Sequence, residues 1–121
     1  MLGKGKVHRQ VDREMFTMYD SKTESYNEPV FAINKHDVVR MMLNLFRDPQ
    51  QQEKNKFFVN AEDYSLFKIG DFCLKTGTVV AINPPEHVAN MHELRSVVEK
   101  ERPRQRAEKK DAELVQHPGG H

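Results

Sequence analysis

The apolar residues of this chain follow two different spacings, one typical of strands and one typical of helices. Short or alternating apolar runs predict four strands: residues 14–19, 29–33, 64–74 and 78–82. Between the last two runs, the short loop Lys75-Thr76-Gly77 predicts a β-hairpin. The polar segment 20–28 predicts a turn, and Asn83-Pro84-Pro85 predicts the end of the sheet.

A helix is predicted directly after the second strand. Asn34 can cap its N-terminus, and Asp37 places a carboxylate near the positive end of the helix dipole. Apolar residues at helical spacing give it one face: Val38, Met41, Met42, Leu45 and Phe46. Asp48-Pro49 is expected to end this helix, because helical backbone is disfavoured at a residue before proline.

The remaining segments predict a linker, a short buried segment and a second helix. Residues 50–56 are polar and predict the linker, Phe57-Phe58-Val59 predicts the buried segment, and residues 60–63 predict a turn. From Glu86 onward, apolar residues recur at the spacing of an amphipathic helix: Val88, Met91, Leu94 and Val98. Pro103 is expected to end or kink this helix.

These elements predict an α+β fold, with a small, mainly antiparallel sheet of about four strands, one packed helix and a C-terminal helix. We expect residues 1–13 to be a disordered basic arm and residues 14–94 to be the single domain. Residues 95–121 are expected to be a charged tail, helical or disordered. No apolar run approaches the roughly 20 residues that a membrane span needs, so no membrane association is expected.

Residues 64–71, within the third predicted strand, alternate in a way that assigns their side chains to two faces. Ser65, Phe67 and Ile69 share one face, and we expect this face to lie in the core. Tyr64 and Lys68 would then form a solvent-facing pair on the other face.

Charge is distributed unevenly and suggests where a nucleic acid would bind. The net charge of +1 divides into +3 for residues 1–13, −4 for residues 14–94 and +2 for residues 95–121. Because phosphate attraction dominates such binding, the flanks are the first candidates. Their candidate nucleic-acid-binding residues are Lys4, Lys6, Arg9, Arg13, Arg102, Arg104 and Arg106. The C-terminal run can also be interpreted as a solvated helix held by ion pairs.

Aromatic side chains on a sheet, with lysine or arginine beside them, are a common platform for single-stranded nucleic acid. The sheet residues that could serve in this way are Tyr19, Tyr26, Tyr64 and Lys68. A domain of this size needs most of its phenylalanines in the core, whereas a tyrosine hydroxyl tolerates exposure. The tyrosines are therefore the stronger candidates.

Catalytic and metal chemistry find little support in the sequence. His87 and His92 are five residues apart and would not share a helix face, and Cys73 has no second cysteine to pair with. Cys73 is expected to be a buried, inert thiol. Four carboxylates, interpreted as turn and cap residues, could otherwise converge on a cation: Asp20, Glu62, Asp63 and Asp71. We expect no catalytic residues, no metal, no cofactor and no enzyme activity.

Two motifs resemble the small nonstructural protein of gokushoviruses, tailless single-stranded DNA phages of the Microviridae. The first is Met18-Tyr19-Asp20-Ser21-Lys22, followed by Tyr26 and Pro29-Val30-Phe31. The second is Glu62-Asp63-Tyr64-Ser65-Leu66-Phe67-Lys68-Ile69-Gly70-Asp71-Phe72, ahead of Thr76-Gly77. The similarity spans about residues 15–82.

The resemblance implies a phage accessory protein that acts in viral single-stranded DNA synthesis or handling in the host cytoplasm. Its partner would be single-stranded DNA, a phage replication protein or a host replication factor, and no catalytic residues come with it. The alternative is a protein-interaction module that docks on a host factor or on a phage replication or packaging protein without contacting DNA. Its amphipathic segment Val88–Val98 could fill a groove on such a partner. An exposed sheet edge would also allow pairing into a homo-oligomer.

Overall fold

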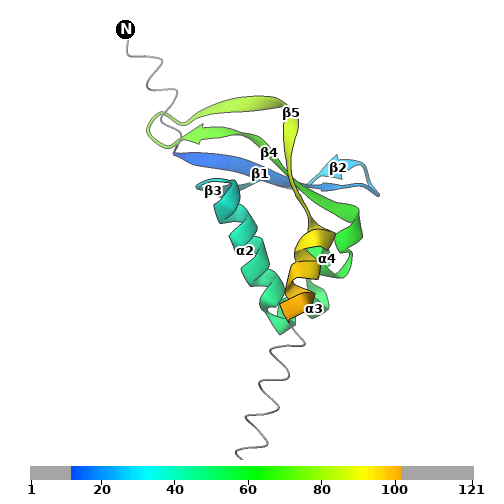
Figure 1. The fold of residues 1–121 in the computed structure, drawn as a ribbon. Helices are drawn as coiled ribbons and strands as arrows, with labels where there is room; N and C mark the ends of the chain where they lie inside the picture. The colour runs from blue at the N-terminus through cyan, green and yellow to red at the C-terminus, as the bar shows by residue number, and fades with distance from the viewer. Residues whose placement is uncertain (1–11, 102–121) are drawn as a thin grey trace, which may run out of the picture.

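The computed structural model describes residues 12–101, in which an antiparallel sheet carries all of its helices on one side (Figure 1). The strands are β1 (Arg13–Asp20), β2 (Ser25–Tyr26), β3 (Val30–Ala32), β4 (Tyr64–Cys73) and β5 (Thr78–Asn90). The helical segments are α2 (Lys35–Arg47), α3 (Pro49–Lys54), α4 (Lys56–Val59), the 3-10 turn η1 (Ala61–Asp63) and a C-terminal helix over residues 91–101. The predicted α+β fold with a small antiparallel sheet is confirmed.

The sheet has the strand order β2-β1-β4-β5, and β3 pairs with β1 as well. β2 and β3 share one edge of β1, because β3 pairs with its first half and β2 with its last two residues. Asn27 joins the two short strands to this edge, since both its backbone N–H and its side-chain amide donate to the carbonyl of Met18. The pattern predicted β1 and β3, and β2 lies in the segment expected to be only a turn.

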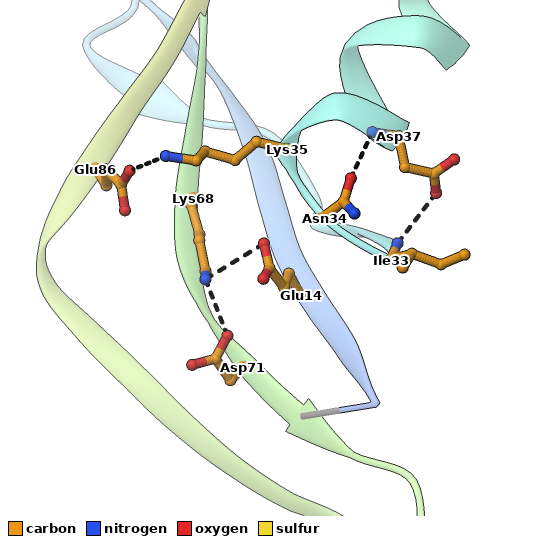
Figure 2. A network of polar contacts seen from close by, with 8 residues as sticks. All are labelled: Glu14, Ile33, Asn34, Lys35, Asp37, Lys68, Asp71 and Glu86. Atoms are coloured by element: carbon orange, nitrogen blue, oxygen red, sulfur yellow. Dashed lines mark hydrogen bonds and ion pairs between the residues drawn. The ribbon is translucent and has the colours of Figure 1, made fainter. Parts of the chain in front are cut away.

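The capping residues at the two ends of α2 explain both its position and the helix α3, which the sequence did not predict. Asn34 Oδ1 accepts a hydrogen bond from Asp37 N at 2.8 Å, and Asp37 Oδ2 accepts one from Ile33 N at 3.0 Å, so the cap is reciprocal (Figure 2). Asp48 ends α2 and then caps α3, accepting from Gln50 N at 2.9 Å. The expectation of a polar linker over residues 50–56 was therefore wrong. Aspartate followed by proline can begin a helix as well as end one.

The core lies between α2, the C-terminal helix and the near face of the sheet. Val38, Met42 and Phe46 of α2 are buried, as their spacing predicts. Met41 and Leu45, which were expected on the same face, are 43% and 42% exposed, because Val39 and Leu43 complete the buried stripe instead.

The strand β5 continues beyond the point where the sequence predicted the end of the sheet. β4 and β5 pair up to Gly70 with Ala81 and resume at Lys68 with Glu86, so residues 82–85 form a bulge that contains Asn83-Pro84-Pro85. Proline is tolerated there because the ladder is already interrupted. The C-terminal helix consequently begins at residue 91 rather than at Glu86.

The C-terminal helix crosses the domain boundary expected at residue 94. Leu94 and Val98 are both buried in the core. At its end, Glu101 accepts two hydrogen bonds of 3.0 Å from the guanidinium of Arg47 at the end of α2. None of the helices within residues 12–101 is long and apolar enough to cross a membrane.

Candidate nucleic-acid interface

The register of the sheet decides which side chains lie on the face covered by helices. Residues paired directly across two strands share a face. Met18 pairs with Leu66, and Asp20 pairs with Tyr64, so Tyr64 and Leu66 lie on the helix-covered face with the buried Met18. The expectation that Tyr64 faces solvent and Phe67 faces the core was wrong. Alternation separated the two sets correctly, but both sets are apolar enough to serve as a core.

Tyr64 is a core residue. Its side chain is only 7% exposed, and its ring packs edge-on against Phe57 with centroids 4.9 Å apart. Burial, followed by the charge of Asp20, raises the pKa of the Tyr64 hydroxyl above the ordinary tyrosine value. This tyrosine cannot offer its ring to a nucleic acid.

The side chain of Lys68 is also largely shielded from solvent, and it lies on the same helix-covered face as Tyr64. Its ammonium lies 3.3 Å from Glu14 and 3.1 Å from Asp71, and its side chain is 14% exposed (Figure 2). Burial by itself lowers the pKa of Lys68, but the hydrogen bonds to Asp71 and Glu14 outweigh it and hold the pKa above the ordinary lysine value. Two carboxylates around one ammonium leave a local excess of negative charge, which would repel phosphate.

The opposite, open face of the sheet carries an aromatic row with one ring from each strand of the main order. The row consists of Tyr26 in β2, Tyr19 in β1, Phe67 in β4 and His87 in β5. Ring centroids are 4.9 Å apart for Tyr19 and Tyr26, 6.1 Å for Tyr19 and Phe67, and 5.4 Å for Phe67 and His87. Tyr26 is 47% exposed. The structure thus brings Tyr19 and Tyr26 together, as a tyrosine platform requires, and adds two rings that the sequence did not single out.

Polar side chains fix the β5 end of the row. Asn90 Oδ1 accepts a hydrogen bond from Ser65 Oγ at 2.9 Å and lies 2.8 Å from His87 Nε2. Because an amide oxygen only accepts, His87 donates from Nε2 in this arrangement. Ser65 and Asn90 therefore hold the imidazole against Phe67.

A second aromatic pair extends the open face toward the β4–β5 hairpin. Phe31 and Phe72 have centroids 5.6 Å apart. By register Phe72 shares its face with Arg13 and Val79. Arg13 is exposed, which makes it the one predicted binding cation that the structure describes on this face. The other flank candidates lie outside the described residues: Lys4, Lys6, Arg9, Arg102, Arg104 and Arg106.

Carboxylates accompany many cations elsewhere on the described surface. The cations in ion pairs are Lys22, Lys35, Arg40, Arg47, Lys68 and Arg95. Residues 12–101 together carry a net charge of −4. This excess of negative charge on residues 12–101 opposes the approach of phosphate to the described part of the chain.

The carboxylates considered for cation binding have structural partners. Asp20 accepts from Lys22 N at 2.9 Å in the turn after β1, Asp63 pairs with Lys22, and Asp71 pairs with Lys68. Glu62 pairs with Arg95, which also donates to the carbonyl of Phe58 at the end of α4. Within residues 12–101, no group of three or more histidine, cysteine or acidic side chains is gathered for a metal ion.

Cys73 is half-buried near the hairpin rather than fully buried as expected. Hydrogen bonds from Thr76, first from its side chain and then from its backbone, lower the pKa of the thiol. The thiol therefore belongs to the hairpin turn and not to the core.

The fold and this surface define a class: small α+β proteins with a helix-covered core face and an open, aromatic sheet face. The comparison with protein families is more specific. The family model described as Phage ORF5 protein matches residues 13–94, more than half of the chain. The chain belongs to this family and is a phage protein. No curated protein and no solved structure gives a significant match.

Proposed function

We propose that this chain is a non-structural phage accessory protein that acts in viral single-stranded DNA synthesis or handling in the host cytoplasm. It would do so without catalysis, by binding single-stranded DNA or the replication complex that carries it. The observation that supports this proposal best is the aromatic row on the open face. The resemblance to the gokushovirus protein gives the biological setting, and the Phage ORF5 family agrees with a phage origin.

The aromatic row suits unpaired bases because stacking requires only an exposed ring and accepts every base. Tyr19, Tyr26 and Phe67 contact one another, and His87 lies against Phe67, so a DNA strand lying across the sheet would meet these three rings before it reaches His87 in β5. A duplex keeps its bases stacked on each other and could not use such a row without opening. The proposal therefore includes a preference for single strands.

The aromatic row and the basic flanks are expected to make different contributions to binding, stacking from the row and electrostatic attraction from the flanks. With −4 on residues 12–101, long-range attraction to DNA falls to the basic segments 1–11 and 102–121. Stacking on the sheet would then hold bases that the flanks have brought close. Binding should weaken steeply with salt, and the stacking contribution should persist at salt concentrations that remove the electrostatic one.

The test is fluorescence anisotropy of the full chain with a labelled single-stranded oligonucleotide at low and physiological salt. Tyr26→Ala removes the exposed tyrosine ring of the row, and we expect the affinity to fall roughly 5- to 150-fold, from about 1–3 kcal/mol per stacked base. Tyr26→Phe is the matched control and should retain most of the affinity because it keeps the ring. Equal affinity of Tyr26→Ala and the parent chain would contradict the proposal.

The flanks are tested in the same assay by neutralising charges in the full chain. Replacing Lys4, Lys6 and Arg9 by glutamine should weaken binding and reduce its salt dependence. The same change at Arg102, Arg104 and Arg106 should act in the same direction. If neither set of substitutions nor the salt concentration changed the affinity, the basic flanks would be excluded as the source of electrostatic attraction to DNA.

The second candidate function is docking on a phage or host protein without DNA contact. Its original support, a free amphipathic helix over Val88–Val98, does not hold, because Met91, Leu94 and Val98 are buried in the core. The observation that favours it now is the β4–β5 hairpin, where Leu74 and Val79 are 56% and 53% exposed. Capture of a defined partner from nuclease-treated extract, lost in Leu74→Ser, would favour docking.

A further inference from the structure

A groove of about 460 Å³ lies between α2 and β5, on the helix-covered side of the sheet and at its β5 edge. One part of its lining is polar and includes two cations; it consists of Lys35, His36, Arg40 and His87. The other part is aliphatic and consists of Val39, Leu43 and Val88. A volume of this size lies within the range of ligand sites, and its two kinds of lining match an anion attached to an apolar body.

His87 connects this groove with the aromatic row. Its ring contacts Phe67 at a centroid distance of 5.4 Å, and the same side chain lines the groove. The register explains this double position, because Leu66 pairs with Ala89 and Phe67 with His87, which leaves Val88 as an extra residue. Such a bulge twists the edge strand and re-aims its side chains. A chain of nucleotides on the row can therefore pass over β5 at His87 and enter the groove.

We propose that the groove is a second subsite for single-stranded DNA, which binds one nucleotide of a strand stacked on the aromatic row. The phosphate lies among Lys35, His36 and Arg40, and the sugar or base packs on Val39, Leu43 and Val88. This inference rests on the proposed function and adds to it a defined phosphate contact and a direction for the strand, from β2 toward β5.

The cations of the groove already have carboxylate partners, which sets the strength of the subsite. Lys35 Nζ lies 2.7 Å from Glu86 Oε2, reaching from the start of α2 to β5 (Figure 2). Arg40 pairs with Asp37 one helical turn away. The Lys35 and Glu86 side chains are 51% and 44% exposed, and ion pairs this exposed are weak. A phosphate can therefore compete for Lys35, and Glu86 is expected to limit the affinity.

The experiment uses the full chain and a labelled oligothymidylate in anisotropy over a series of salt concentrations. Lys35→Gln should weaken binding roughly fivefold and reduce the magnitude of the slope of log affinity against log salt by about 0.7, the value for one phosphate contact on a single strand. Glu86→Gln should strengthen binding because it releases Lys35. The double variant K35Q/E86Q keeps the net charge of the parent chain and should still bind as weakly as Lys35→Gln.

Arg47→Gln is the matched control for a lost cation on the same helix. Arg47 lies at the far end of α2 in an exposed ion pair with Glu101, outside the groove lining. We expect it to leave the affinity and the salt slope near those of the parent chain. If the three groove variants all behave like Arg47→Gln while Tyr26→Ala still weakens binding, the subsite is overturned and the proposed function stands.

A second measurement separates the subsite from the proposed function. Thymidine 5′-monophosphate is titrated into the labelled full chain and followed by amide chemical shifts, with thymidine as the reference probe. Shifts at His36, Arg40 and Val88 with the monophosphate only would support a nucleotide site even if the oligonucleotide failed to bind. Absence of these shifts at millimolar monophosphate would overturn the subsite, whatever the oligonucleotide does.

Discussion

The helix-covered face and the open face of the sheet both carry aromatic side chains, but they place them in different surroundings. On the helix-covered face, Phe16 is fully buried and Tyr64 is 7% exposed, each beneath helices. On the open face, Tyr26 and Phe31 are 47% and 48% exposed, and each ring contacts other rings of that face. The same residue type is therefore covered by helices on one face and accessible on the other. Exposure, rather than aromatic content, separates the two roles.

The largest expected difference between the faces is in stability. Phe16→Ala should lower the free energy of unfolding by about 3–5 kcal/mol, because it leaves a cavity in the core. Phe31→Ala removes the same side chain from the open face and should cost about 1 kcal/mol or less. Urea unfolding followed by circular dichroism measures both. Similar losses for the two variants would mean that Phe31 is covered and that the two faces of the sheet do not differ in exposure.

A smaller effect is expected at Gly70, where β4 lies close to the backbone of β5. A Cβ at Gly70 would lie 2.8 Å from the carbonyl oxygen of Val80, so the strand backbones must separate to accept it. Gly70→Ala should cost about 1–3 kcal/mol, as overpacking does, and should speed amide exchange along the β4–β5 ladder.

Gly77→Ala is its control. A Cβ there meets nothing within 4 Å, and only the positive φ of 73° in the turn opposes it. Faster exchange should then be confined to the turn. Unchanged exchange along the ladder in Gly70→Ala would show that the contact relaxes at no cost.

The smallest expected effect is the alkaline titration of the tyrosines. The pKa of Tyr64 is raised in the folded chain, so its contribution to stability is fully present below the unfolded tyrosine pKa of about 10 and is lost as pH rises through the folded value. Absorbance of tyrosinate during a pH titration should show a late component. Tyr64→Phe should remove this component, whereas Tyr26→Phe should leave it in place. A late component that survives in Tyr64→Phe would place Tyr64 outside the core.

The elements that depend on local pattern could be predicted from the sequence. The cap of α2, the β4–β5 hairpin and the strands β1 and β3 follow from spacing and turn chemistry within a few residues. The helix α3 and the second half of β5 could not be predicted so directly, because Asp48-Pro49 and Pro84-Pro85 were each interpreted as stops. A proline can end an element, but it can also lie at the start of a helix, as Pro49 does, or in a bulge, as Pro84 and Pro85 do. Only tertiary pairing decides which of these positions it takes.

The candidate site could be predicted in part. Tyr19 and Tyr26 lie together on the open face, and their role in binding stays a prediction, whereas Tyr64 and Lys68 were assigned to the wrong side of β4. The alternation of β4 carries large apolar residues on both faces, so hydrophobicity could not identify the core side. His87 was missed because its segment was predicted to be helical, and a strand assignment would have paired it with Phe67.

The prolines in the β5 bulge have a consequence for how these molecules behave at high concentration. β5 is the last strand of the main order and borders the sheet on that side. Pro84 and Pro85 have no backbone N–H, and they lie where the ladder already deviates. A strand from another molecule that tried to lengthen the sheet here would find donors missing in the middle of its pairing. The bulge therefore disfavours edge-to-edge association of two sheets along β5.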